Sequence, residues 1–366
     1  MQVEYREGQG RSYFAASNSR GGFHSDYEAC FRHRVDRLMC IKGGPGTGKS
    51  TLMRHVANEA ERRGWRAEYY YCSSDADSLD AVLLFGKGRS LGLLDATLPH
   101  AFEPSLPGVE EEILDLGRFW DAALLTERRG EITALNRHKT EGYRMAYRYL
   151  AGVGEMSDIL RALVPPVLDR PRMERTVRRL LRDCPAGDGK GEFKIGLCDS
   201  IGMKGRVRLD TYLSLGDRVC LIEDYHDSAF EMMRLLANEA FGRGLRARVS
   251  YHPILTDEVD ALYLPDSKTV FLACGVRDAE SCRARAPHAR LISMRRYVCR
   301  ESFALVRGRV RYATQMREAL IAGAKDAFAR VSEAHDALER LYGEAMDFAA
   351  VERYTAELCH KWFEEE

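Results

Sequence analysis

Residues 43–50 of the chain read GGPGTGKS, and Thr51 follows them directly. Glycines in such a loop let backbone N–H groups turn toward a bound anion and cradle phosphate oxygens. In this pattern, Lys49 reaches the β- and γ-phosphates and the Ser50 hydroxyl takes one position on Mg²⁺. The pattern is the P-loop (Walker A) motif. The predicted nucleotide-binding residues are Gly43, Gly44, Pro45, Gly46, Thr47, Gly48, Lys49, Ser50 and Thr51.

The segments on either side of the loop have the order that this motif requires. Residues 37–41 (RLMCI) form an apolar run of strand length. Residues 50–63 have apolar side chains at the spacing of an amphipathic helix, and Gly64 is a typical helix terminator. We therefore expect strand, loop and helix in succession, with the helix N-terminus adding partial positive charge to the phosphate site. The alternative is a glycine-rich turn without a ligand.

Two acidic positions complete the predicted site. Residues 91–95 (LGLLD) have the pattern of a Walker B strand, which places Asp95 near Mg²⁺, usually through water. A strand-end turn residue is the other interpretation of Asp95. Ala96 stands where many ATPases have a glutamate, so the base must come from elsewhere. Asp75 or Asp77, after an aromatic-rich strand at 66–72, could serve, because ligands sit beyond the carboxyl ends of such strands. The predicted catalytic residues are Lys49, Asp95 and Asp75, and the predicted metal ligands are Ser50 and Asp95.

Composition excludes several classes of protein. The chain has 366 residues, enough for two ordinary domains, and 55 basic residues balance 55 acidic ones. A net charge of zero argues against nucleic acid and against an anionic membrane as partners. The ten cysteines include no C-x-x-C pair, which argues against a zinc site or a disulfide framework and indicates a reducing, cytoplasmic location. The polar first residues also lack the pattern of a signal peptide.

The sequence repeats itself. Residues 56–60 (VANEA) return as residues 236–240 (LANEA), an offset of 180 positions. The second copy lacks the phosphate loop, because Ala229 and Phe230 replace Lys49 and Ser50 and the glycines are gone. The acidic residues of this segment (Glu223, Asp224 and Asp227) would also repel a triphosphate. The predicted division is a nucleotide-binding domain at 1–182, a Pro/Gly-rich linker at 183–191, and a degenerate copy with C-terminal helices at 192–366.

Several short stretches carry a family resemblance: residues 14–18 (FAASN), 21–23 (GGF), 72–75 (CSSD), 78–80 (SLD), 95–100 (DATLPH), 107–108 (PG), 116–117 (LG) with Trp120, and 345–348 (AMDF). In these stretches and the loop, the chain resembles an uncharacterised bacterial family of cytoplasmic tandem P-loop nucleotide-binding proteins, described mainly as ATPases. The resemblance implies two P-loop domains and supplies no known reaction. In that family the second half usually has its own intact P-loop, and this chain departs from the family there.

The remaining features leave alternatives open. The pattern from residue 313 to 363 predicts a helical hairpin that packs between the domains or onto another subunit. Arg118, Arg144 and Arg148 are candidates for an arginine finger in cis, with no ground for choosing one. His100 either lines the site or lies in a turn, and His24 either contacts a base or caps a turn.

These observations predict an α/β protein with tandem P-loop NTPase-like domains, each a parallel sheet flanked by helices, and a C-terminal helical hairpin. The first domain is expected to bind ATP and Mg²⁺ and to act as an ATPase. ATP is expected over GTP because no Asn-Lys-x-Asp guanine signature occurs. One alternative is a kinase for a small-molecule acceptor, with Asp75 as base. Another is a non-enzymatic switch whose nucleotide state is sensed by a protein partner.

Overall fold

The computed structural model describes residues 4–6, 11–99, 102–185, 187, 191–276 and 278–364. His100 and most of the predicted linker (186 and 188–190) lie outside the described residues. The elements of the first half are β1 Glu4–Arg6, β2 Arg11–Phe14, β3 Ala16–Ser19, β4 Gly22–Ser25, α1 Tyr27–Phe31, β5 Arg37–Lys42, α2 Lys49–Arg62, β6 Arg66–Tyr71, β7 Leu79–Gly86, β8 Arg89–Asp95, β9 Glu111–Asp115, η1 Leu116–Phe119, α3 Ala122–Glu127, α4 Arg129–Leu163, η2 Pro165–Val167 and α5 Arg170–Leu180. Those of the second half are β10 Phe193–Ile195, β11 Asp199–Gly202, β12 Gly205–Leu209, α6 Thr211–Leu215, β13 Arg218–Glu223, α7 Ala229–Gly242, β14 Ala247–Tyr251, β15 Val259–Leu264, η3 Pro265–Ser267, β16 Thr269–Cys274, α8 Ala279–Arg285, β17 Arg290–Ser293, η4 Met294–Tyr297, α9 Arg300–Glu344 and α10 Phe348–Phe363.

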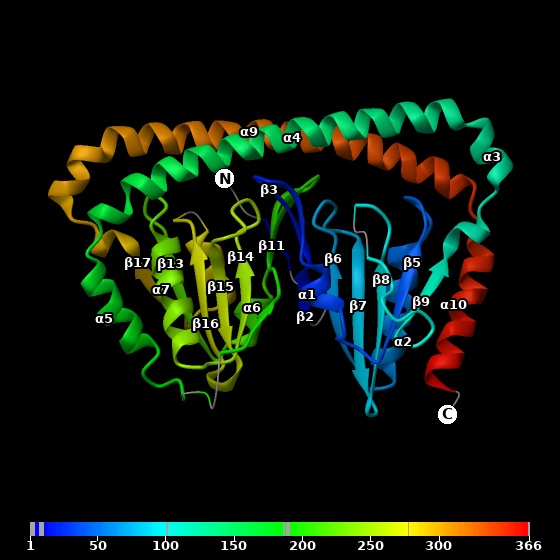
Figure 1. The fold of residues 1–366 in the computed structure, drawn as a ribbon, viewed down its shortest axis with the longest axis horizontal. Coiled ribbons are helices and arrows are strands. Elements are labelled where there is room, and N and C mark those ends of the chain that lie inside the picture. The colour runs from blue at the N-terminus through cyan, green and yellow to red at the C-terminus, as the bar shows by residue number, and fades with distance from the viewer. Residues whose placement is uncertain are drawn as a thin grey trace.

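Two six-stranded sheets form the body of the molecule, and they have the same strand order. The first sheet runs β2-β6-β7-β8-β5-β9 and the second runs β10-β14-β15-β16-β13-β17 (Figure 1). The segments that repeat in the sequence occupy equivalent elements, since β5, α2 and β6 correspond to β13, α7 and β14. The two halves are therefore equivalent in topology as well as in sequence pattern.

The prediction of purely parallel sheets is wrong in one strand of each sheet. β7 and β15 run antiparallel to both of their neighbours, while the other pairings are parallel. The cause lies in the connections. The two residues Lys87 and Gly88, both at positive φ, join β7 to β8 as a tight turn, and a connection this short can only join antiparallel strands. The architecture is α/β with mixed, mainly parallel sheets flanked by helices.

Helix α2 shows how the sequence pattern determines local packing. Its predicted apolar face (Leu52, Met53, Val56, Ala57 and Ala60) is buried against the first sheet. The helix ends before Gly64, which takes φ +82°. Glycine adopts this left-handed conformation without steric cost, so the predicted stop is confirmed.

Helices α4 and α9 pair along their lengths and lie across both sheets, and we call this pair the roof (Figure 1). They are antiparallel, because Gly142 lies against Val331 while Gly152 lies against Leu320. The predicted hairpin is therefore wrong, because the two helices within residues 313–363 do not pack on each other. The long helix α9 packs on α4 from the other half of the chain, and the short helix α10 turns away from it to reach the first sheet.

The last helix of each half packs on the sheet of the other half. α10 covers α2, with Leu358, Trp362 and Phe363 in the core of the first sheet. α5 covers α7 on the second sheet (Figure 1). Equivalent hydrogen bonds fix the start of each exchanged helix to the other half. At α10, the Asp347 N–H donates to the Phe119 carbonyl at 2.9 Å, and at α5, the Asp169 N–H donates to the Tyr297 carbonyl at 2.7 Å. Burying each large apolar side chain stabilises such a contact by roughly 1.5–3 kcal/mol, so the exchanged helices are integral to both cores.

Two hairpins also join the halves. The Arg20 N–H, in the β3–β4 turn, donates to the Ile254 carbonyl at 2.9 Å, and the Met203 N–H, in the β11–β12 turn, donates to the Ser74 carbonyl at 2.8 Å. The β3–β4 hairpin thus contacts the loop that follows β14, and the β11–β12 hairpin contacts the loop that follows β6. The loop that contains Asp75 is consequently in direct contact with the second half of the chain.

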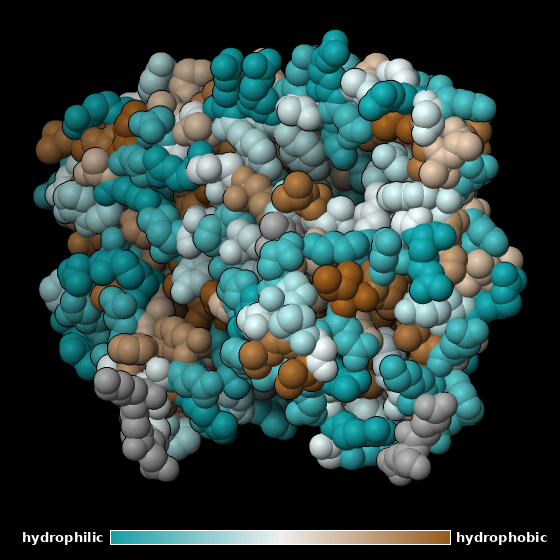
Figure 2. All heavy atoms as spheres, turned by 45° about the vertical axis from the view of Figure 1, so that its right-hand side comes forward, coloured by the Kyte–Doolittle hydropathy of each residue, from teal (hydrophilic) through white to brown (hydrophobic). Residues whose placement is uncertain are grey.

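The surface is mostly polar on the side viewed in Figure 2, where apolar side chains form small separate groups among charged ones. Among the helices of the described residues, none combines enough length and apolar character to cross a membrane. The roof helices are long enough but carry charges throughout.

Candidate functional site

The glycine loop, residues 43–50, lies between the carboxyl end of β5 and the first turn of α2. Gly46 and Gly48 take φ values of +68° and +84°, a region in which other residues are strained. Gly48 directly precedes the first residue of α2, so the N–H groups of the loop and of the helix start face the same space. This is the arrangement in which backbone dipoles attract an anion.

Lys49 and Asp95 meet at the head of this loop. The Lys49 Nζ donates to the Gly43 carbonyl at 3.0 Å and to the Gly44 carbonyl at 2.7 Å. It also lies 3.5 Å from Asp95 Oδ2, and both side chains are only 13% exposed. Asp95 ends β8, which pairs in parallel with β5, so adjacent strands bring the two residues together. The sequence placed these two residues at one site, and the structure brings them into contact.

The hydroxyl groups of the loop are engaged in holding its shape. The Thr47 hydroxyl donates to the Gly44 carbonyl at 2.9 Å. The Ser50 hydroxyl accepts a hydrogen bond from the Leu79 N–H at 2.9 Å, which leaves its own proton and a further lone pair for another partner. Pro45 is half-buried in the loop, and Thr51 is exposed on the first turn of α2.

Asp75 lies in a tight turn after β6. Its carboxylate accepts hydrogen bonds from the Ser78 hydroxyl at 2.7 Å and from the Asp77 N–H at 3.4 Å. These bonds stabilise the turn, and within the described part of the chain no hydrogen bond or ion pair joins Asp75 to Lys49 or Asp95. A role as base stays a prediction.

The other candidates do not lie against the loop. Arg118 stacks on Phe119 and Tyr354, while Arg144 and Arg148 are exposed on α4. His24 lies 3.3 Å from the Asp26 carboxylate at the start of α1. Among the described residues, none of the four forms a hydrogen bond or an ion pair with the glycine loop.

The end of α9 lies directly on the glycine loop, a contact that the sequence did not reveal. A Cβ built on Gly46 would be 2.3 Å from the Glu339 carbonyl oxygen, and one on Gly44 would be 3.1 Å from the Tyr342 ring. Burial and the charge of Lys49 lower the pKa of the Lys139 ammonium on α4, while the charge of Glu339 raises it. The end of α9, which comes from the second half of the chain, therefore covers the loop.

The second half has a different loop at the equivalent position, and we call residues 224–228 the acidic loop. The Asp224 carboxylate accepts hydrogen bonds from the Asp227 N–H at 2.9 Å and the Ala229 N–H at 2.8 Å. His226 and Asp227 have φ values of +55° and +65°, so the backbone follows a left-handed path similar to that of the glycine loop. The N–H groups that would face a phosphate are instead satisfied by a carboxylate of the chain itself.

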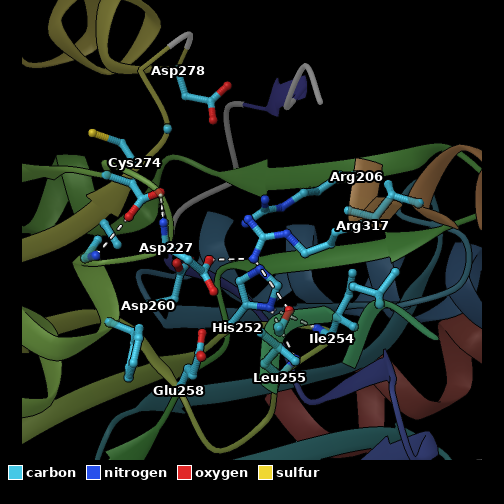
Figure 3. Close-up of a pocket in the computed structure, with 18 of the residues that line it drawn as sticks. Arg206, Asp227, His252, Ile254, Leu255, Glu258, Asp260, Cys274, Asp278 and Arg317 are labelled. Carbon is cyan, nitrogen blue, oxygen red and sulfur yellow. Dashed lines mark hydrogen bonds and ion pairs between the residues drawn. The ribbon is translucent and has the colours of Figure 1, made fainter. Parts of the chain in front are cut away.

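A cavity of about 220 Å³ lies beside the acidic loop, under the roof (Figure 3). Charged side chains of both signs line it, and they are paired with one another. Arg317 of α9 donates to Asp227 at 2.6 Å, with side chains 19% and 16% exposed. The fully buried Arg208 donates to Asp199 at 2.8 Å and also to Asp260. The cavity is thus walled by two separate groups of buried ion pairs.

Burial dominates the protonation of these groups. It raises the pKa of the Asp224 carboxyl, and the neighbouring Asp227 adds to the effect. It raises the pKa of Glu258 to about 8, again with a contribution from Asp227. Burial also lowers the pKa of His252 well below its usual range. Because Asp224 already occupies the N–H groups that a phosphate would need, the acidic loop is not suited to a triphosphate.

The roof residues at the two loops are equivalent in the repeat, and this signal was available in the sequence. Asp169 and Asp347, the N-cap residues of α5 and α10, are 178 positions apart. The same offset relates Lys139 to Arg317 and Arg161 to Glu339. Arg161, over the second sheet, pairs with Asp257 at 3.0 Å and with Glu258 at 2.6 Å. Extending the repeat past the sheets would have identified all four roof residues.

Among the described residues, no group of three or more His, Cys, Asp or Glu side chains could hold a metal ion. This finding is compatible with Mg²⁺ at the glycine loop, because such ions take few protein ligands and are held largely by water and substrate phosphates. The donors present there are one hydroxyl, Ser50, and one carboxylate, Asp95.

Comparison with known proteins gives one partial match. Residues 23–84 match the family model described as Nephrocystin 3, N-terminal, a family related to NTPase-like folds. The match runs from β4 through α2 into β7 and so includes the whole glycine loop. Neither the curated proteins nor the solved structures gave a match to the chain. The match relates residues 23–84 to a family with NTPase-like folds, which agrees in part with the predicted resemblance. The comparisons give no support for the bacterial tandem family.

Proposed function

We propose that the glycine loop binds ATP with Mg²⁺ and that the protein is an ATPase with one active site. The observation that carries the proposal is the contact of Lys49 with Asp95 at the head of a glycine loop that opens a helix. A cation for the phosphates, a carboxylate for the metal and aligned N–H groups then share one edge of the sheet. The family match over residues 23–84 supports the same conclusion.

Each residue has a defined task in this proposal. Lys49 exchanges its bonds with the Gly43 and Gly44 carbonyls for bonds with phosphate oxygens. The Ser50 hydroxyl and, through water, Asp95 hold Mg²⁺. When bound, Mg²⁺ neutralises charge on the phosphates. Because Ala96 offers no base, the attacking water must be oriented by another group, and Asp75 is the candidate.

A second candidate function is a nucleotide-dependent switch. The observation that favours it is the packing of the α9 end on Gly44 and Gly46, since a ligand in the loop would contact a helix that spans both sheets. A kinase would differ from the ATPase and the switch because it requires a small-molecule acceptor for the phosphate. No observation points to a site for such an acceptor.

One experiment separates these functions. Purified protein is incubated with γ-labelled ATP and Mg²⁺, with and without a metabolite extract, beside Lys49→Ala and the control Lys361→Ala, which changes an exposed residue of α10. Free labelled phosphate without extract supports the ATPase, label on a metabolite supports the kinase, and tight binding without turnover supports the switch. Lys49→Ala should lose nucleotide binding while Lys361→Ala keeps it; equal binding by both variants and the parent protein would contradict the assignment of the loop.

A further inference from the structure

The Gly43 carbonyl, at the entrance of the glycine loop, accepts two hydrogen bonds. The Lys49 Nζ donates to it at 3.0 Å, and the Thr97 hydroxyl donates to it at 2.9 Å. A carbonyl oxygen has two lone pairs, so both donors can bind it at the same time. Lys49 begins α2, whereas Thr97 lies just beyond the end of β8. The carbonyl therefore keeps a partner if either donor leaves.

The backbone of Thr97 has a separate contact with the same site. Its N–H donates to Asp95 Oδ1 at 2.9 Å, while Asp95 Oδ2 lies 3.5 Å from the Lys49 Nζ. These contacts close a ring through Thr97, Asp95, Lys49 and Gly43. Because the N–H of Thr97 holds Asp95 and the hydroxyl holds Gly43, a change of the side chain alone removes only the contact with Gly43.

The second half shows which hydroxyl groups serve only the shape of a loop. In the first half, the Thr47 hydroxyl donates to the Gly44 carbonyl. At the equivalent place in the second half, the Ser228 hydroxyl donates to the Tyr225 carbonyl at 2.7 Å. This bond is present in a loop that has no lysine, so it stabilises the turn in both halves.

The Thr97 hydroxyl has no such counterpart. The register of the strand pairs makes Ala273 of β16 the equivalent of Asp95 of β8. Gly275 then stands at the position of Thr97, and it has no side chain. The second half has thus replaced the lysine, the carboxylate and this hydroxyl together. Their joint replacement indicates that the hydroxyl belongs with the lysine and the carboxylate.

Phosphate binding requires Lys49 to leave two carbonyls. In the proposed function, its ammonium exchanges the Gly43 and Gly44 carbonyls for phosphate oxygens. Both glycines are half-buried, and a carbonyl left there without a donor is costly. Gly43 keeps the Thr97 hydroxyl and Gly44 keeps the Thr47 hydroxyl. The ammonium can therefore move without leaving either carbonyl unpaired.

We propose that Thr97 is a positioning residue whose hydroxyl holds the Gly43 carbonyl when Lys49 moves to a phosphate. The proposal rests on the nucleotide site proposed above. The hydroxyl lowers the cost of moving the ammonium, and it keeps the backbone at Gly43 in place while the loop N–H groups face the ligand. In this role Thr97 acts through Gly43 and Lys49 and contacts neither the phosphates nor the metal ion.

The first test needs no nucleotide. Urea denaturation gives the unfolding free energy of the parent protein, Thr97→Val, Lys49→Met and the double variant. Valine keeps the shape of threonine without the hydroxyl, and methionine keeps most of the lysine stem without the ammonium. Each single variant leaves Gly43 one donor and the double variant leaves none, so the double variant should lose more than the sum of the single losses. Additive losses would show that the two donors do not share the carbonyl, and they would overturn the proposal.

The second test measures the affinity for a non-hydrolysable ATP analogue with Mg²⁺, by calorimetry on the full chain. Thr97→Val should bind roughly tenfold more weakly, because Lys49 then leaves the Gly43 carbonyl without a donor. Thr97→Ser keeps the hydroxyl and should bind within about twofold of the parent protein. The matched control is Thr126→Val, which removes an exposed hydroxyl that donates to the Ala122 carbonyl at 2.7 Å, and its affinity should equal that of the parent protein.

The outcomes of the second test separate this proposal from the nucleotide site itself. Binding by the parent protein with no weakening in Thr97→Val overturns the role of Thr97 and leaves the site. Equal weakening in Thr97→Val and Thr97→Ser would assign the effect to packing of the side chain, and it also overturns that role. Absence of binding by the parent protein overturns the nucleotide site and the role of Thr97 with it.

Discussion

The glycine loop and the acidic loop occupy equivalent places in two sheets of the same topology. They differ in what lies against the backbone N–H groups at the start of the following helix. Both place backbone N–H groups at the start of a helix, and such groups require an acceptor. The acidic loop supplies Asp224 from its own sequence, while the glycine loop keeps its glycines and packs against the main chain of Glu339 in the distant roof. The difference teaches that a carboxylate within the loop itself can occupy the N–H groups that a bound phosphate would otherwise use.

The largest expected effect tests the buried ion pair of Arg317 with Asp227, which attaches α9 to the acidic loop. Arg317→Met leaves Asp227 buried without its partner, so we expect a loss of about 3 kcal/mol in unfolding free energy, measured by urea denaturation. The equivalent change in the first half, Lys139→Met, removes an ammonium that burial and Lys49 already disfavour, and it should cost less than about 1 kcal/mol. Equal losses in the two variants would remove the proposed difference between the halves.

The next effect tests the packing of α9 on the glycine loop. Gly46→Ala forces a side chain into the left-handed region and against the Glu339 carbonyl, so it should cost about 2 kcal/mol or more. Gly64→Ala is the control, since Gly64 has φ +82° and no neighbouring atom within 4 Å. It should cost only about 1 kcal/mol. Urea denaturation gives both values, and a cost no larger at Gly46 than at Gly64 would show that α9 does not press on the loop.

A smaller effect concerns pH and the second half. The folded pKa of Glu258, about 8, lies above its ordinary value of 4.5, so the folded state binds more protons than the unfolded state between these values. Unfolding free energy should therefore decrease as pH rises through this window. Glu258→Gln cannot ionise and should flatten the decrease, measured by urea denaturation at pH 5, 6.5 and 8. A slope as steep as in the exposed control Glu333→Gln would contradict the assignment.

The smallest effect concerns the exposed contact between a hairpin and the roof. Arg20 donates to Asp158 at 2.8 and 2.5 Å, but the two side chains are 28% and 45% exposed. Solvent screens such a pair, so Arg20→Ala should lower unfolding free energy by less than about 1 kcal/mol. A loss as large as that of Arg317→Met would mean that the hairpins, rather than the buried pair, join the roof to the body.

Local pattern predicted much of the fold. Residues 37–42, 49–62 and 66–71 form the expected strand, helix and strand because each has its own periodicity and its own terminator, such as Gly64. The direction of β7 could not be derived from periodicity, because alternation does not encode which way a strand runs. The partner of α9 could not be derived either, since a helical face specifies an apolar neighbour without identifying it.

The candidate site divides in the same way. Lys49 and Asp95 were predicted together because the motif of Lys49 follows β5 and the motif of Asp95 ends β8, and these two strands are adjacent. Glu339 is 290 positions from Lys49 and belongs to no motif, so only its place in the repeat points to it. Tertiary packing alone brings its main chain to the loop.

The exchange of α5 and α10 has a consequence for the origin of the chain. A polypeptide with a single repeat could bury its last helix in this way only by lending it to a second copy and borrowing that copy's helix in return. The arrangement resembles that of a two-fold homodimer with swapped ends, with both copies in one polypeptide. In a homodimer a mutation changes both loops together, whereas in one chain each loop can change alone. Having both copies in one chain allows one loop to keep its glycines while the other has acidic residues in their place.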